Sequence, residues 1–142
     1  MLVDPRNARD PTYLEHLHTM EHRGTCPFCP EAYDHTRILQ TRGSWHIARS
    51  NWPYESAKHH LLIISKEHRT SFLELSASDF SDIQMLFKWA MEQFCICGGG
   101  LALRFGETLY SGATVCHLHF HIIQPELKAD GTSVHVVHFP IG

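Results

Sequence analysis

The stretch His117-Leu118-His119-Phe120-His121-Ile122-Ile123 places three histidines at alternating positions, each followed by an apolar residue. Successive side chains of a β-strand point to opposite faces, so this pattern predicts a strand with imidazoles on one face and apolar side chains in the core. Histidine titrates near neutral pH and can act as nucleophile, general base or metal ligand. Three histidines on one face therefore indicate a reactive site.

Two kinds of chemistry fit this row of imidazoles. Histidines two apart on a strand can chelate a metal ion that keeps an open position for water. Alternatively, one imidazole attacks an electrophile while its neighbours position it and exchange protons with it. The turn Gly112-Ala113-Thr114 lies just upstream, where glycine lets an anion approach the backbone and threonine offers a hydroxyl and an amide. Its place directly before the histidines favours phosphorus chemistry.

The composition is typical of one globular domain. The chain has 142 residues, of which 43% are hydrophobic and 19% charged, and its formal net charge is −3. No overall basic charge indicates nucleic acid as the main partner, and no apolar run reaches the roughly 18 residues of a membrane span. A polar N-terminus and an odd number of cysteines, five, favour a reducing compartment. We expect a cytoplasmic domain over residues 1–142, with an N-terminal extension over 1–35 and a core over 36–142.

The hydrophobic periodicity predicts both helices and strands. Apolar residues three and four apart predict a short N-terminal helix over 11–22 and one main helix over 79–95, with Ser76 and Asp79 as a capping box. Strand candidates lie at 36–40, 44–48, 60–65, 101–105, 116–123 and 134–139. Strands, then a helix, then strands, joined by short turns, favour an α+β fold with an antiparallel meander of about five strands.

Cys26 and Cys29 form a Cys-x-x-Cys pair with a proline after each cysteine. A redox motif, a zinc knuckle and two buried thiols are all compatible with such a pair. No helix follows, which argues against a redox site, because its reactive cysteine needs a helix N-terminus. Two thiolates are only half of a tetrahedral zinc site, so two further ligands are required. The other cysteines, at positions 95, 97 and 116, are interpreted as small core residues.

These motifs resemble those of the histidine triad family of nucleotide-binding proteins. Residues 117–123 match the family signature His-φ-His-φ-His-φ-φ, where φ is hydrophobic, and residues 112–115 are similar to the segment before it. Residues 60–68 are similar to the family's His-φ-φ-φ-φ-Pro-Lys-x-His strand and turn, with Ser65 in place of proline. The likeness covers roughly residues 26–125. It implies a five-stranded antiparallel sheet, a homodimer, and a nucleotide held with its α-phosphate over the triad.

The resemblance also implies the roles of individual residues. His119 would be the nucleophile that forms a covalent nucleotidyl-histidine intermediate. His121 would lie near the phosphate and the leaving group, and His60 would support it in a proton-coupled chain. Gly112 and Thr114 would contact the α-phosphate.

Two positions depart from the family pattern within the substrate site. Ala113 stands where members often carry glutamine, so that hydrogen-bond donor to the phosphate is absent. A subset of the family has a ribose-binding asparagine three residues before a Pro-Tyr pair. In this chain the pair is Pro53-Tyr54 and Ser50 occupies that position, with Asn51 beside it. Either Ser50 or Asn51 is expected to bind a ribose hydroxyl.

Members of the superfamily, which includes galactose-1-phosphate uridylyltransferases, can also bind a zinc ion. The resemblance implies structural zinc on four residues, Cys26, Cys29, His68 and His117, which leaves His119 metal-free. We therefore expect an enzyme, a nucleotide hydrolase or nucleotidyltransferase acting at the α-phosphate of a purine nucleotide such as a dinucleoside polyphosphate or nucleoside phosphoramidate. The alternatives are a non-catalytic nucleotide-binding module and a metal-dependent hydrolase that uses the triad as ligands.

Overall fold

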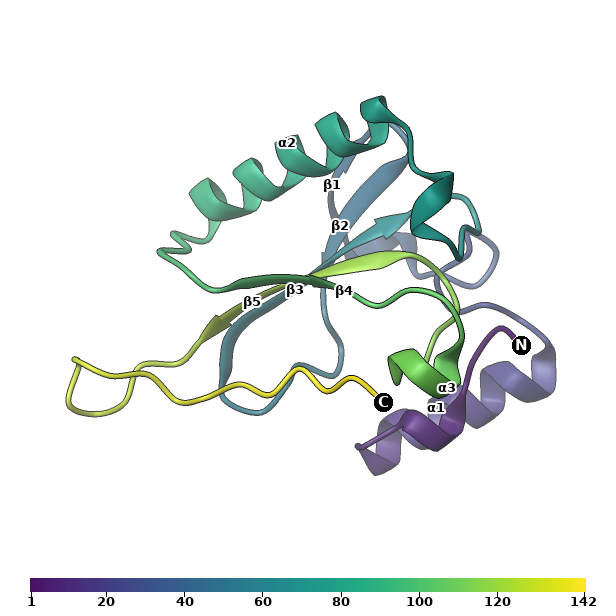
Figure 1. Cartoon of the computed structure of the whole chain (residues 1–142), viewed down its shortest axis with the longest axis horizontal. Coiled ribbons are helices and arrows are strands. Elements are labelled where there is room, and N and C mark those ends of the chain that lie inside the picture. Colours follow the sequence, from purple (N-terminus) through teal and green to yellow (C-terminus); the bar gives the residue numbers. More distant parts are fainter.

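A five-stranded antiparallel sheet lies at the centre of the fold, which the computed structural model describes for all 142 residues (Figure 1). The strand order is β1-β2-β3-β5-β4, with bounds β1 Ile38–Arg42, β2 Trp45–Arg49, β3 Ala57–Ser65, β4 Gly100–Leu103 and β5 His119–Pro125. Helix α2 (Ala77–Gln93) covers one face of the sheet, and α1 (Pro11–Arg23) and the short α3 (Thr108–Ser111) lie on the other side (Figure 1). The expected α+β fold is confirmed. None of its helices has the length and apolarity needed to cross a membrane.

Local capping explains where the two longer helices begin and end. The Asp10 carboxylate accepts hydrogen bonds from the first free amides of α1, and Gly24 ends the helix in the left-handed conformation, with φ 63°. Helix α2 begins with a capping box in which Ser76 and Asp79 each bond the other's backbone amide. Both predicted helices are therefore present, but α2 ends at Gln93 rather than at residue 95.

The core confirms the alternation that the sequence predicts for β5. Leu118, Phe120 and Ile122 are buried in a cluster of eleven residues between the sheet and α2. Their histidine neighbours consequently lie on the opposite face of the sheet. A smaller cluster holds the N-terminal segment in place: Val3, Leu17, Met20, Cys26 and Val115.

Two kinds of sequence prediction are wrong: a strand near the C-terminus and three cysteines in the core. Residues 134–139 do not form a strand, because β5 is already paired on both sides by β3 and β4, and Val134 makes only an isolated bridge to Leu127. Cys95 and Cys97 are exposed in the loop after α2, and Cys116 is only half-buried, so none of the three is a core residue.

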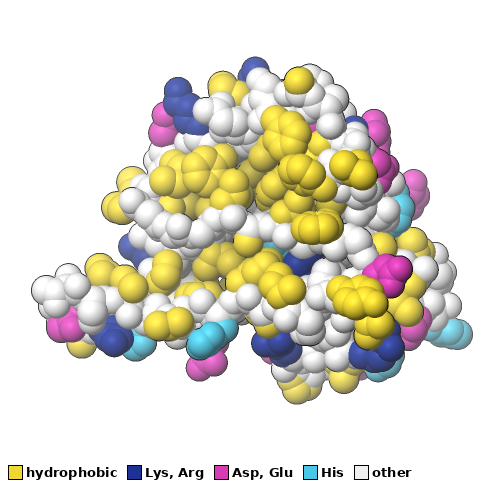
Figure 2. All heavy atoms as spheres, viewed as in Figure 1, with side chains coloured by type: hydrophobic (Ala, Val, Ile, Leu, Met, Phe, Trp, Pro, Cys, Tyr) yellow, Lys and Arg dark blue, Asp and Glu magenta, His cyan; other side chains and the backbone are white.

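Strand β4 forms one edge of the sheet, and apolar side chains are exposed beside it. Leu101 on β4 is 50% exposed, and Phe105, Leu109 and Tyr110 in the following segment are between 66% and 72% exposed. Figure 2, drawn in the same view as Figure 1, shows apolar side chains gathered on this face of the molecule. Exposed apolar groups next to an unpaired strand edge are a feature of association surfaces.

Candidate active site and metal centre

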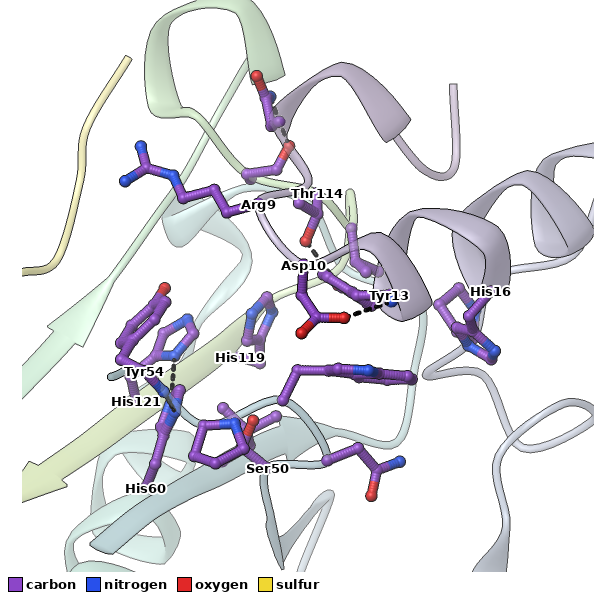
Figure 3. Close-up of a pocket in the computed structure, with 18 of the residues that line it drawn as sticks. Arg9, Asp10, Tyr13, His16, Ser50, Tyr54, His60, Thr114, His119 and His121 are labelled. Carbon is purple, nitrogen blue, oxygen red and sulfur yellow. Dashed lines mark hydrogen bonds between the residues drawn. The ribbon is translucent and has the colours of Figure 1, made fainter. Parts of the chain in front are cut away.

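A cavity of about 710 Å³ lies on the histidine face of the sheet. Its lining includes His119 and His121 from β5, His60 from β3, and residues of three other segments: the N-terminal segment, the loop after β2, and the turn 112–115 (Figure 3). The predicted catalytic and substrate-binding residues, which are His60, His119, His121, Gly112, Ala113, Thr114, Ser50 and Asn51, therefore all face one cavity. The first triad histidine, His117, does not line it.

Hydrogen bonding fixes the tautomer of His119. Its Nδ1 atom lies 2.7 Å from the carbonyl oxygen of His117, which can only accept, so Nδ1 carries the proton. The unprotonated atom is therefore Nε2. Burial lowers the pKa of His119 to about 4, so the ring is neutral at pH 7. A neutral imidazole with a free Nε2 lone pair is chemically suited to nucleophilic attack.

A second chain of hydrogen bonds fixes the protons on His60 and His121. The Tyr54 amide donates to Nδ1 of His60 at 3.1 Å, so the proton of the neutral His60 ring is on Nε2. That atom lies 2.9 Å from Nδ1 of His121 and donates to it. Burial lowers the pKa of His60 to about 4 and that of His121 well below its usual value. Neutral His121 therefore carries its proton on Nε2, which is buried and has no protein partner.

The turn 112–115 is held by contacts from the N-terminal segment. Gly112 ends α3 in the left-handed conformation, with φ 66°. The side chain of Asn7 donates to the Ala113 carbonyl at 2.9 Å, and the hydroxyls of Tyr13 and Thr114 lie 2.6 Å apart. The ring of Tyr13 also packs against Trp52, with centroids 4.4 Å apart. The sequence analysis missed the part that Asn7 and Tyr13 play, because no local motif links residues about a hundred positions apart.

Four metal-ligating side chains converge outside the cavity. Ligand atoms of Cys26, Cys29, His68 and His117 all lie within 4.8 Å of one another. Nδ1 of His117 lies 3.3 Å from Nδ1 of His68 and 3.4 Å and 3.7 Å from the two sulfurs. Tetrahedral zinc with bonds of about 2.0–2.3 Å requires ligand atoms about 3.3–3.8 Å apart. Four of the six pairs of ligand atoms lie at 3.3–3.7 Å and the other two within 4.8 Å, so the cluster can hold a tetrahedral ion once those two pairs close slightly.

The surroundings of this cluster leave the right atoms free for a metal. Nε2 of His117 lies 2.7 Å from the Ser65 carbonyl and must donate to it, which leaves Nδ1 unprotonated and facing the cysteines. Burial raises the pKa of the Cys26 thiol to about 12, so its thiolate form needs a compensating cation. The Arg69 guanidinium, next to His68, donates to the Asp79 carboxylate at 2.7 Å. The backbone carbonyl of Arg69 accepts the amide of Leu118, next to His117, at 2.7 Å. These bonds fix both histidine ligands to the sheet.

Comparison with known proteins agrees with this geometry. The family model described as "Scavenger mRNA decapping enzyme C-term binding" matches residues 25–136, which is most of the chain. A comparison with curated proteins finds no match.

Several solved structures share the fold. One is the diadenosine triphosphate hydrolase of Plasmodium falciparum, with 23% identity, coverage of 71% of this chain and 68% of that chain, and a TM-score of 0.56. Another is a histidine triad nucleotide-binding protein of Candida albicans, with 21% identity, 73% coverage of each chain and a TM-score of 0.56. A zinc-bound histidine triad protein of Mycobacterium smegmatis has 19% identity, covers 72% of this chain and 73% of that chain, and has a TM-score of 0.50. The chain, with its row of histidines at residues 117–121, thus belongs to the scavenger mRNA decapping enzyme C-terminal family and, with it, to the histidine triad proteins.

Proposed function

We propose that the protein is a nucleotide hydrolase or nucleotidyltransferase that acts at the α-phosphate of a purine nucleotide through a nucleotidyl-histidine intermediate. The observation that carries this proposal is the tautomer of His119, whose Nδ1 proton is held by the His117 carbonyl while Nε2 keeps its lone pair. Two other imidazoles that line the cavity, His60 and His121, bond one another rather than His119. This arrangement provides a nucleophile and a separate hydrogen-bond donor for the leaving group.

The proposed reaction has two displacements. Nε2 of His119 forms a bond to the α-phosphorus while the bond to the leaving oxygen breaks, and the leaving group departs as an anion that accepts a hydrogen bond from Nε2 of His121. His60 donates to Nδ1 of His121 and so keeps that proton on the outer nitrogen. Water or another acceptor then attacks the phosphorus as the bond to Nε2 of His119 breaks, its proton passes to solvent, and the nucleotide leaves a neutral His119. Backbone amides of the turn 112–114 would stabilise charge on the non-bridging oxygens.

We place the nucleoside at the end of the cavity that carries Trp52. Its indole packs against Tyr13 and offers an aromatic surface for a purine base. Ser50 and Asn51 line the same region and remain candidates for bonding a ribose hydroxyl. This placement leaves the end of the cavity beside Tyr54 and His121 for the leaving group.

The proposed function is tested by mass spectrometry of the intact protein. The wild type is incubated with a panel of dinucleoside polyphosphates and nucleoside phosphoramidates and is quenched within a turnover. We expect release of a nucleoside monophosphate and an adduct with the mass of one nucleotidyl group. The non-catalytic alternative, which Ala113 favours because it lacks the amide of the usual glutamine, predicts nucleotide binding with neither product nor adduct.

The geometry does not favour a catalytic metal bound by the triad. Nδ1 of His117 faces the two cysteines, and His121 bonds His60, so the three triad imidazoles do not converge on one point. We propose instead that Cys26, Cys29, His68 and His117 hold a structural zinc ion. Zinc bound there would brace His117, whose carbonyl orients His119. It would also join the N-terminal extension, residues 1–35, to the core, residues 36–142.

We further propose a cytoplasmic homodimer. All five cysteines are free thiols, as expected in a reducing compartment. The dimer would form through the free edge of β4, where a second copy pairs antiparallel and covers Leu101 and its exposed neighbours.

The dimer is tested by light scattering coupled to size-exclusion chromatography. We expect twice the chain mass of 16.3 kDa, and we expect Leu101→Lys to give the single-chain mass. Leu73→Lys is the control, because Leu73 is 92% exposed in the segment before α2, away from β4. A wild type that is monomeric at micromolar concentration contradicts the proposal.

A further inference from the structure

The N-terminal segment forms one wall of the cavity and lies outside the residues that the family model matches. The match begins at residue 25, whereas Arg9, Asp10 and Tyr13 line the cavity together with the triad (Figure 3). One hydrogen bond between the hydroxyls of Tyr13 and Thr114, and packing of the Tyr13 ring at a tilt against Trp52, join this wall to the matched region. The segment therefore adds side chains to the cavity that the matched residues do not supply.

Arg9 differs from the other three arginines that line the cavity. Arg104 donates through all three of its guanidinium nitrogens to protein oxygens, Arg37 donates to the Arg49 carbonyl, and Arg49 lies over the ring of Phe94. Arg9 makes no hydrogen bond, ion pair or ring contact with the protein. Arg9 is therefore the arginine of this cavity whose guanidinium has no protein partner at all, although Arg37 and Arg49 also keep unbonded nitrogens.

The position of Arg9 indicates which part of a ligand it would meet. In Figure 3 its side chain extends towards the end of the cavity where Tyr54 and His121 lie, away from Tyr13 and His16. In the proposed reaction this is the end of the leaving group. Guanidinium binds phosphate oxygens with charge-assisted, frequently bidentate hydrogen bonds.

The neighbouring residue, Asp10, carries a fixed carboxylate with one free oxygen. Its Oδ1 accepts the amides of Thr12 and Tyr13 at 2.8 Å and 3.0 Å, which fixes the side chain at the start of α1. No protein group donates to Oδ2. In Figure 3 the carboxylate points into the cavity between His119 and Tyr13, on the side where we place the nucleoside. A carboxylate oxygen only accepts, so it selects a hydrogen-bond donor in the ligand.

We propose that Arg9 and Asp10 orient the substrate and define its class. Arg9 binds the phosphate that follows the α-phosphate, and Oδ2 of Asp10 accepts a hydrogen bond from a ribose hydroxyl. The preferred substrate is then a ribonucleotide phosphoanhydride, whose leaving group is anionic, rather than a phosphoramidate with an amine leaving group. This inference rests on the proposed function of the same cavity.

The role of Arg9 is tested by calorimetric titration of adenosine monophosphate and of the α,β-methylene analogue of adenosine diphosphate, which carries both phosphates but cannot be cleaved between them. We expect the wild type to bind the diphosphate about tenfold more tightly, as one charge-assisted hydrogen bond would give. Arg9→Gln should reduce this preference to less than twofold while leaving the affinity for the monophosphate within threefold. Arg23→Gln is the matched control, because it removes the same charge from the far end of α1, and it should keep the preference.

The role of Asp10 is tested by comparing adenosine monophosphate with its 2′,3′-dideoxy analogue. The wild type should bind the analogue about tenfold more weakly or worse, the value of one hydrogen bond to a charged acceptor. Asp10→Asn should lose most of this preference, and any remainder is the contribution of Ser50 or Asn51. Asparagine caps a helix as well as aspartate does, so an unchanged melting temperature will show that α1 is intact.

The outcomes separate this inference from the proposed function. Arg9→Gln with an unchanged preference for the diphosphate, or Asp10→Asn that rejects the dideoxy analogue as strongly as the wild type does, overturns the inference. These are equilibrium measurements that need no turnover. A wild type that shows both preferences but forms no adduct on His119 contradicts the proposed reaction and leaves the assignment of Arg9 and Asp10 standing.

Discussion

Replacement of His119 by alanine is expected to abolish turnover while nucleotide binding survives. Loss of a nucleophile removes the covalent route altogether, and the rate is expected to fall on the order of 10³-fold or more. The cavity keeps its turn at 112–114, Arg9 and Trp52, so the dissociation constant for adenosine monophosphate should change by less than about threefold. Steady-state kinetics and calorimetric titration of the same preparation measure the two quantities.

A matched control comes from another buried histidine. His46 on β2 is 4% exposed, and its Nε2 atom has no partner, but it does not line the cavity. His46→Ala should therefore retain most of the turnover, whatever its effect on the melting temperature. Turnover of His119→Ala comparable to that of the wild type, with no loss of adduct, would show that another group attacks the phosphorus.

The fold and much of the site could be predicted because their signals are local. Alternation over residues 117–123 depends only on the two-residue period of a strand, and the core contacts of Leu118, Phe120 and Ile122 follow it. Capping of α2 by Ser76 and Asp79 is likewise a feature of neighbouring residues. The period of two also indicated an extended segment near residues 134–139, but it cannot show that β5 has no free edge to pair with.

The proton positions in the site could not be read from the sequence. His119 and His121 occupy equivalent places in the repeat, yet one bonds a carbonyl through Nδ1 and the other accepts from His60. This difference depends on which atoms the fold brings within hydrogen-bond distance. The same limit applies to Arg9 and Asp10, which reach the cavity because Tyr13 meets Thr114, 101 residues away.

Substitution of a zinc ligand is expected to lower stability strongly. The metal would join Cys26 and Cys29 in the N-terminal extension to His68 after β3 and His117 before β5. Without it, the extension is held mainly by the five-residue cluster around Leu17, a small core compared with the eleven residues under α2. Loss of a structural metal belongs to the changes that cost more than about 4 kcal/mol. For a chain of this size that corresponds to a fall in melting temperature of about 12 °C.

The test compares Cys26→Ser with Cys116→Ser in protein prepared without chelators. Elemental analysis should find about one zinc per chain in the wild type and in Cys116→Ser, whose half-buried thiol lies outside the cluster, and almost none in Cys26→Ser. Only Cys26→Ser should show the lower melting temperature. The activity of its folded molecules, measured well below that temperature, should fall proportionally less than its stability. The reason is that the ion braces the strand of His119 and does not touch the substrate. Wild-type protein without zinc, or equal melting temperatures of the two variants, would rule out a structural metal and leave the four side chains as a hydrogen-bonded cluster.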